Sequence, residues 1–236
     1  MARVATVLGR ADDARRYAGL HDRVRHAWQR EFIADGRLNP DTQANHVRAL
    51  AFDLVPPSLR DAVAARLVEL VRAAGTHLAT GFLATPLLLP VLAEAGHLDV
   101  AYELLFQETE PGWLVMVDRG ATTMWERWDG VDAEGVAHES LNHYAKGAVV
   151  SFLHEYVTGL AAVEPAYRRF RVRPRPGGGL TWAHAVHESP YGRIEVRWSL
   201  LEERFQLYVT VPPGTSAEVT LPSGSTRTLG PGAHQL

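Results

Sequence analysis

A carboxylate between two tryptophans is the feature of this sequence best suited to chemistry. Glu126 lies between Trp125 and Trp128, and Asp129 follows directly. Sugars present flat C–H faces that stack on aromatic rings, and their hydroxyl groups hydrogen-bond to carboxylates. The run therefore favours carbohydrate binding, with these four side chains as candidate site residues.

This run lies in a long segment, residues 107–139, without a helix or strand pattern. Connections longer than about 15 residues inside a compact domain are usually functional or disordered. The aromatic residues of the segment, Trp113 among them, argue against disorder. Two interpretations stay open: a sugar site, or a structural ion pair in which Glu126 is buried beneath the tryptophans with Arg119 or Arg127.

A second polar cluster, residues 138–144, precedes a predicted helix. It begins like the zinc motif H-E-x-x-H, but Asn142 stands where the second histidine belongs. His138 and His143 are five residues apart, which does not place both rings on one helix face. We therefore expect no metal site and no cofactor. Asn142 and His143 are expected to face a pocket, with a plain structural role as the alternative for His143.

The elements that must position these residues change in character along the chain. Apolar residues at spacings of three and four predict helices up to about residue 156, and period-two alternation between Pro- and Gly-rich turns predicts strands beyond it. The fold class expected is mainly α, with a small antiparallel β-sandwich as its tail, and the domains expected are residues 1–160 and 161–236. Helices are expected over residues 11–33, 41–54, 58–74, 85–96, 99–107 and 140–156, and strands over 169–173, 180–185, 193–198 and 205–209.

Composition narrows the classes of partner. The chain has 236 residues, with 24 Lys and Arg against 27 Asp and Glu, which gives a net charge of −3. This balance predicts neither a nucleic acid nor an anionic membrane as partner. The absence of cysteine excludes a disulfide scaffold and a thiolate metal site. Without a membrane-length apolar run or a signal-peptide pattern, we expect a cytoplasmic protein.

Four stretches in a fixed order resemble the C-terminal part of the bacterial α-L-rhamnosidases, an inverting glycoside hydrolase family. The most specific is Ala-Thr-Thr-Met-Trp-Glu-Arg-Trp-Asp-Gly at residues 121–130, supported by residues 80–86, 142–148 and 173–183. The resemblance covers essentially the whole chain. It implies a partial, roughly half, α/α toroid barrel of the six-hairpin type followed by a β-sandwich.

The resemblance also implies roles for individual residues. Glu126 matches the family's general base, and His143 matches a histidine that lines the rhamnose pocket. Trp113, Trp125 and Trp128 would be aromatic walls of that pocket. The family's general acid comes from an Asp- and Glu-rich motif in the first half of the barrel, which we do not place in this sequence. Lys146 departs from the family pattern, because a large apolar residue is common there.

Together these observations predict an α-L-rhamnosidase-like glycoside hydrolase, or the part of one that carries the general base, acting on terminal α-L-rhamnosides. The alternative is a non-catalytic protein that binds sugar or another chain. Since half a barrel would leave apolar helix edges in water, we expect a second copy or a complementary chain to complete it.

Overall fold

The computed structural model describes residues 1–132, 134–202 and 204–236. The chain divides into two compact units, Met1–Leu87 and Leu88–Leu236. Among the described residues, no helix combines the length and the apolar character needed to cross a membrane.

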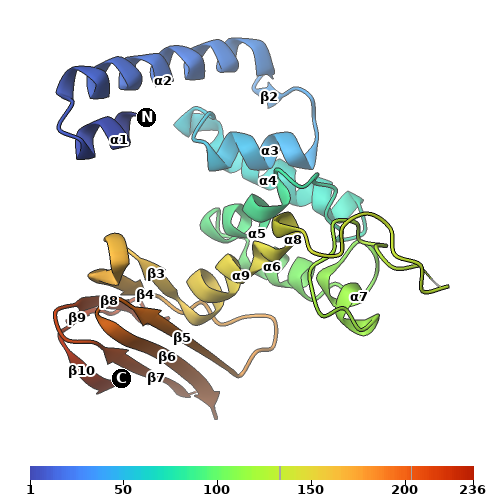
Figure 1. Ribbon diagram of the computed structural model, residues 1–236. Coiled ribbons are helices and arrows are strands. Elements are labelled where there is room, and N and C mark those ends of the chain that lie inside the picture. Colours follow the sequence, from blue (N-terminus) through green and yellow to red (C-terminus); the bar gives the residue numbers. More distant parts are fainter. Residues whose placement is uncertain (133, 203) are drawn as a thin grey trace. The chain divides into compact units, whose positions relative to one another are not determined.

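The N-terminal unit is built from helices and one short hairpin (Figure 1). In the hairpin, β1 pairs with β2 through a turn at Asp35 and Gly36, which have φ values of 51° and 74°. Two positive φ angles in succession are what a tight two-residue hairpin requires, and Asp-Gly supplies them at low cost. The elements are α1 (Ala2–Val7), α2 (Ala11–Phe32), β1 (Ile33–Ala34), β2 (Arg37–Leu38), α3 (Gln43–Ala51), η1 (Pro57–Leu59) and α4 (Arg60–Ala73).

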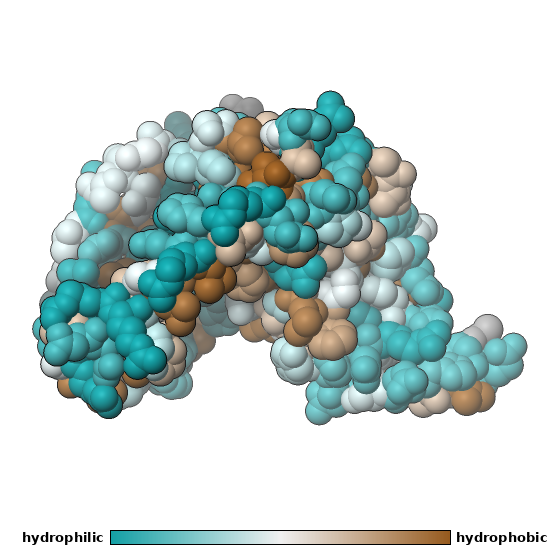
Figure 2. Space-filling model, turned by 90° about the horizontal axis from the view of Figure 1, so that it is seen from above, coloured by the Kyte–Doolittle hydropathy of each residue, from teal (hydrophilic) through white to brown (hydrophobic). Residues whose placement is uncertain are grey.

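Helix α2 confirms the helix expected over residues 11–33, yet none of its residues is buried. Leu20 and Val24 are 44% and 55% exposed although they lie on its apolar face. Figure 2, which views the molecule from above, shows hydrophobic residues in brown scattered among hydrophilic residues in teal. The apolar stripe of an amphipathic helix normally packs against a neighbour. Helix α1 contacts α2, but Leu20 and Val24 stay exposed in the described chain.

The core of the N-terminal unit lies between α3 and α4. Val47 from α3 and Leu67 and Val71 from α4 have no exposed surface. Helix α3 begins at an N-cap, because the Thr42 hydroxyl accepts a hydrogen bond from the Asn45 N–H at 3.2 Å. Both helices were expected, and both are shorter than predicted at their N-terminal ends.

Helices continue from α5 into the C-terminal unit, and here the expected boundaries need correction. The segment expected as a loop over residues 107–139 contains a helix, α7. The single helix expected over residues 140–156 begins only at Tyr144 and is divided into three short turns. Helices α5 and α6 were expected. The elements are α5 (Thr85–Glu94), α6 (Leu98–Leu105), α7 (Trp113–Asp118), α8 (Tyr144–Gly147), α9 (Val149–Phe152) and the π-helical η2 (Leu153–Thr158).

Within the described residues, the tail forms two sheets of four strands, in the orders β10-β7-β6-β5 and β3-β4-β8-β9. Buried residues alternate with exposed ones along the strands, as in Ile194, Val196 and Trp198 of β6. The strands pair antiparallel except β4 with β8, which run parallel. They are β3 (Leu160–Ala162), β4 (Arg169–Val172), β5 (Trp182–Ser189), β6 (Gly192–Leu201), β7 (Arg204–Val211), β8 (Ser216–Thr220), β9 (Thr226–Leu229) and β10 (Gly232–Gln235), with the 3-10 turn η3 (Pro165–Tyr167) between β3 and β4.

Helices and sheets of the C-terminal unit are joined by close contacts. The buried indole N–H of Trp198 donates to the carbonyl of Val157 in η2 at 2.7 Å. The glycine-rich run at residues 177–179 forms a turn that packs on α6. A Cβ on Gly177 would lie 2.5 Å from the Tyr102 ring, and one on Gly178 would lie 2.4 Å from the Phe106 ring. Only glycine permits this approach, which gives the run a packing role.

Candidate active site

An irregular hairpin, residues 124–143, carries most of the candidate residues. Backbone hydrogen bonds run along it from base to tip: the His143 N–H donates to Met124 at 2.8 Å, and the Glu126 N–H donates to Ser140 at 2.8 Å. Farther out, His138 donates to Gly130 at 2.8 Å. The pairing is antiparallel but too irregular for a strand, apart from one bridge between Val131 and Ala137.

This pairing brings the two principal candidates together. Glu126 and His143 are 17 positions apart in the sequence, yet they lie on the paired segments at the base of the hairpin. Both are half-buried. His143 also caps α8, since its Nδ1 accepts a hydrogen bond from the Ala145 N–H at 3.3 Å. A neutral imidazole whose Nδ1 accepts carries its proton on Nε2, which is then the donor.

The three tryptophans occupy different environments. Trp125 is 3% exposed and packs on Gly130, where a Cβ would lie 2.9 Å from the Trp125 Cβ. Trp113 is 4% exposed and stands edge-on to Trp128, with ring centroids 5.4 Å apart. Trp128 is half-buried. Trp113 and Trp125 therefore hold the hairpin by packing, and Trp128 is the most exposed of the three rings. Their role as pocket walls stays a prediction.

Lys146 lies at the centre of these contacts, and sequence reasoning did not place it in the site. Its side chain donates to the backbone carbonyl of Glu126, and its Nζ lies 4.0 Å from the centroid of the Trp128 ring. Its own carbonyl accepts the Trp113 indole N–H at 3.0 Å. Burial lowers the pKa of Lys146 to about 8. The signal in the sequence was a charged residue on a helix face that is usually apolar.

The two arginines considered as partners of Glu126 pair with other carboxylates. Arg127 forms a bidentate pair with Asp129, at 2.9 and 2.7 Å, and this hydrogen-bonded pair lowers the pKa of Asp129 to about 2. Arg119 pairs with Glu110 at 3.2 Å. Among the described residues, neither arginine forms the structural pair with Glu126 that the sequence left open. Asp129 is a carboxylate at the surface, ionised at neutral pH.

The remaining polar residues of the hairpin bond to their neighbours. Asn142 is exposed, and its backbone N–H and carbonyl both bond to the Ser140 hydroxyl. The His138 ring hydrogen-bonds to Asp132 at 2.8 Å, away from His143 in the hairpin pairing. In the part of the chain that the structure describes, no three His, Asp or Glu side chains gather in a way that could hold a metal ion.

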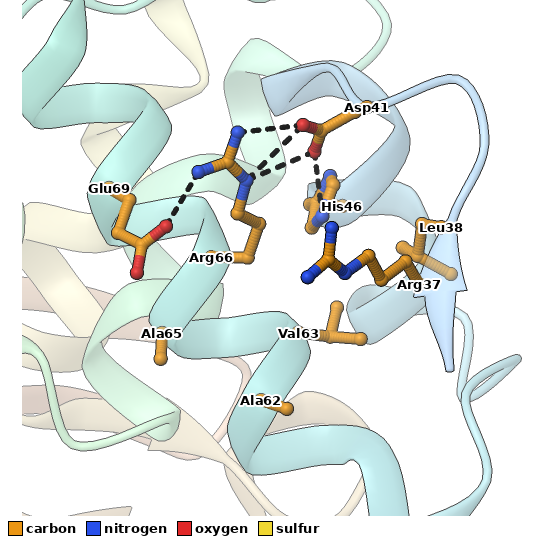
Figure 3. A pocket seen from close by; sticks show the side chains of 9 residues that line it. All are labelled: Arg37, Leu38, Asp41, His46, Ala62, Val63, Ala65, Arg66 and Glu69. Atoms are coloured by element: carbon orange, nitrogen blue, oxygen red, sulfur yellow. Dashed lines mark hydrogen bonds and ion pairs between the residues drawn. The ribbon is translucent and has the colours of Figure 1, made fainter. Parts of the chain in front are cut away.

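A separate polar cavity of about 660 Å³ lies in the N-terminal unit. Figure 3 shows Arg66 pointing at Asp41 and Glu69, with the buried His46 ring beside Asp41. Arg66 approaches Asp41 at 2.7 Å and Glu69 at 2.6 Å, and its hydrogen bond lowers the pKa of Asp41. Because these charges are paired with one another, the cluster fixes α4 to the segment before α3.

Comparison with known proteins identifies the family. Residues 1–157 match the family described as bacterial alpha-L-rhamnosidase 6 hairpin glycosidase domain. Residues 159–234 match the bacterial alpha-L-rhamnosidase C-terminal domain. The chain belongs to the bacterial α-L-rhamnosidase family. Its fold is the helical part of a six-hairpin glycosidase domain followed by β-sheets, which confirms the predicted fold class. The exact boundary predicted at residue 160 stays a prediction.

Relatives of known sequence and structure cover almost all of this rhamnosidase-family chain. An α-L-rhamnosidase of Streptomyces avermitilis is 46% identical over 227 residues, which are 94% of this chain and 22% of the relative. One from Formosa agariphila is 38% identical over 97% of this chain and 25% of its own length. The crystal structure of the Streptomyces avermitilis enzyme complexed with L-rhamnose aligns with a TM-score of 0.93 and 41% identity, over 99% of this chain and 25% of that one.

A fungal structure agrees equally well. The native α-L-rhamnosidase of Aspergillus terreus aligns with a TM-score of 0.95 and 35% identity, over all of this chain and 28% of that one. The chain thus spans about a quarter of the length of these relatives. It is related to the α-L-rhamnosidases, and the activity of the longer proteins is a proposal for this one.

Proposed function

We propose that this chain carries the general-base side of an inverting α-L-rhamnosidase site, with terminal α-L-rhamnosides as its sugar class. The observation that carries the proposal is the irregular hairpin, which brings Glu126 and His143 onto paired segments, with the half-buried Trp128 two residues after Glu126. Carboxylate, imidazole and indole together match the polar and apolar faces of one sugar ring.

Each group has a chemical role in this proposal. The Glu126 carboxylate takes a proton from a water molecule as the water oxygen bonds to the anomeric carbon from the face opposite the leaving group. The glycosidic C–O bond breaks, and its electron pair leaves with the aglycone oxygen. His143 offers an Nε2–H donor to a sugar hydroxyl, and Trp128 packs on the apolar face of the ring. Trp113, Trp125, Asp129 and Asn142 complete the proposed substrate-binding set.

Cleavage of an ordinary rhamnoside also needs a proton on the departing oxygen. Inverting glycosidases supply it from a second carboxylic acid, roughly 6.5–9.5 Å from the base. We assign no residue of this chain to that role. Since general-acid assistance is typically worth about 10²–10⁴-fold, the chain by itself should hydrolyse such substrates weakly or not at all.

Two measurements on the purified chain test the proposal. Calorimetric titration should detect binding of L-rhamnose, and the Glu126→Gln variant should bind it with altered affinity while keeping the wild-type circular dichroism. Release of p-nitrophenol from its α-L-rhamnoside should be weak. Absence of any response to L-rhamnose would defeat the assignment of this site, and robust turnover that Glu126→Gln abolishes would show that the chain holds a general acid after all.

A partner that completes the barrel forms part of the same proposal. Helix α2 has no buried residue, and Val4, Val7 and Leu8 around α1 are 53%, 86% and 66% exposed. Apolar residues gathered in this way favour an interface. A second copy is the simplest partner, because two-fold dimers are the commonest oligomers. An obligate interface should bury more than about 2,000 Å². Light scattering at micromolar concentration tests it: a well-behaved monomer would contradict it.

A further inference from the structure

Lys146 is the only lysine of the chain, and it is 5% exposed. Removing an ammonium group from water costs free energy unless new contacts compensate. A lysine this deeply buried therefore calls for a specific role. The contacts of the Lys146 side chain indicate what that role is.

The Lys146 side chain joins helix α8 to two residues of the hairpin base. The ammonium group donates to the Glu126 carbonyl and lies over the Trp128 ring, 4.0 Å from its centroid. Attraction between a cation and an indole face strengthens when both are out of water. At the other end of the residue, the Lys146 carbonyl holds the Trp113 indole N–H at 3.0 Å. Among the described residues, the ammonium contacts a carbonyl and a ring and forms no ion pair.

Glu126 is consequently anchored on both sides of its Cα. Its N–H donates to the Ser140 carbonyl at 2.8 Å, and its carbonyl accepts from Lys146. With the backbone fixed at both peptide groups, only the side-chain torsions of Glu126 remain free. A general base must hold its carboxylate within hydrogen-bond reach of the attacking water, so fixing the backbone that carries it favours that geometry.

We propose that Lys146 is a positioning residue that fixes the backbone of Glu126 and the face of Trp128, and so sets how both are presented to the sugar. This inference rests on the proposed function only in assigning Glu126 and Trp128 to the sugar site. The contacts themselves stand without that assignment. Lys146 acts through these two residues and is not assigned to contact the substrate.

The arrangement makes the hairpin base sensitive to mildly alkaline pH. Burial lowers the pKa of Lys146 to about 8, while the carboxylates of Asp129, Glu126 and Glu110 act to raise it and Arg127 acts to lower it. Above this pH the amine is neutral. It then loses its attraction to the Trp128 ring and donates a weaker hydrogen bond to the Glu126 carbonyl.

Because the chain has one lysine, NMR with ¹³C,¹⁵N-labelled lysine reports on it alone. In the wild-type chain we expect the ε-CH₂ proton signals at unusually high field, owing to the Trp128 ring current, and a titration midpoint near 8. In a second, uniformly ¹⁵N-labelled sample, the Glu126 amide and the Trp128 indole N–H should follow the same midpoint. A lysine signal at an ordinary shift, with a pKa near the usual 10.5, would overturn the proposal.

Lys146→Met supplies the second test, because methionine keeps the aliphatic stem and removes the charge. We expect amide hydrogen exchange at residues 124–128 to accelerate at least tenfold while the sheets stay protected, and affinity for L-rhamnose to fall at least tenfold. Arg227→Met, at an exposed position on β9, is the control and should change neither. Unchanged exchange and affinity in Lys146→Met would overturn the inference.

The two failures are distinguishable. If the wild-type chain does not bind L-rhamnose, the proposed function fails, and the lysine titration and hydrogen exchange still decide the positioning role. If the wild-type chain binds L-rhamnose and Lys146→Met binds it equally well, the positioning role fails and the proposed function stands. Should Lys146→Met not fold, the wild-type titration alone decides.

Discussion

Two hairpins of the C-terminal unit are stabilised in opposite ways. Strands β5 and β6 pair residue by residue from Ser189 with Gly192 to Trp182 with Ser199, so a continuous backbone ladder joins them. The hairpin of residues 124–132 and 134–143 has a single β-bridge among its described residues. It is held by side chains, namely the packing of Trp125, the buried Lys146 and the capping His143. Regular pairing gives a rigid scaffold. Irregular pairing leaves polar side chains available for chemistry, because they are not committed to a regular strand.

The largest effect on stability is expected in the regular hairpin of β5 and β6. Trp198 is fully buried in β6 and donates to the Val157 carbonyl. Trp198→Ala should lower the free energy of unfolding by about 3–5 kcal/mol through the cavity it leaves. Trp182→Ala, at a position 65% exposed on neighbouring β5, is the control and should cost about 0.5 kcal/mol or less. Urea denaturation measures both, and equal costs would contradict the assignment of Trp198 to the core.

A smaller and more local effect is expected in the irregular hairpin. A Cβ on Gly130 would lie 2.9 Å from the Trp125 Cβ, at the rigid root of that side chain. Gly130→Ala should therefore displace the hairpin, at a cost of about 1–3 kcal/mol, and should weaken L-rhamnose binding while the far-ultraviolet signal of the sheets persists. Gly147→Ala is the matched control, because its Cβ would meet Met124 at an ordinary 3.6 Å. If Gly130→Ala bound L-rhamnose like the wild type, the packing account of the hairpin would be wrong.

Lys146 predicts an unusual dependence of stability on pH. Its pKa is lowered from 10.5 to about 8 in the folded chain, so between these values the unfolded chain binds more protons than the folded one. By linkage, this group makes stability rise as pH increases from about 8 to 10.5, and it costs stability below about pH 8. Lys146→Met should accordingly be the more stable protein at pH 7, by up to about 3 kcal/mol.

The measurement is urea denaturation of Lys146→Met and wild type at pH 7 and pH 10, with Arg227→Met as the control for loss of an exposed charge. The advantage of Lys146→Met should shrink at pH 10. An advantage independent of pH would show that Lys146 titrates equally in the folded and unfolded chains.

The smallest effect is expected at the surface pair of Arg127 and Asp129. Hydrogen bonds from Arg127 lower the pKa of Asp129 from 3.8 to about 2, so the pair contributes stability above about pH 4 that is lost as pH falls through about 2. Carboxyl ¹³C NMR should show the Asp129 midpoint moving back toward 3.8 in Arg127→Gln. An unchanged midpoint would mean that the pair does not persist in solution. Because both side chains are exposed, the change in stability should stay below about 1 kcal/mol.

The comparison of the two hairpins also explains which elements of the fold could be predicted from the sequence. The alternation at residues 193–198 predicted β6, because period-two burial leaves a direct mark on the sequence. Helix α7 was missed, since six residues are too few to establish a helical period. The hairpin was missed because its pairing uses backbone groups and one buried cation, which leave no periodic pattern.

The site residues likewise divide into those that the sequence predicted and those that depend on tertiary structure. The family strings pointed to Glu126 and His143, and the structure places both at the hairpin base. The burial of Trp113 and Trp125 could not be read from the sequence, because aromatic residues in a loop fit a sugar platform and a packed core equally well. Lys146 was noticed as a departure, but its contacts with Glu126 and Trp128 depend on tertiary structure.

Hydrolysis of α-L-rhamnosyl fluoride by the purified chain tests the central claim most directly. Fluoride leaves as an anion with little help from an acid. Hydrolysis of this substrate therefore needs a general base but no general acid. We expect the wild-type chain to accelerate fluoride release above the buffer rate, Glu126→Gln to lose about 10²–10⁴-fold of that rate, and the control Glu134→Gln, farther along the same hairpin, to match the wild type. Equal rates for Glu126→Gln and wild type would contradict the assignment of Glu126 as the general base.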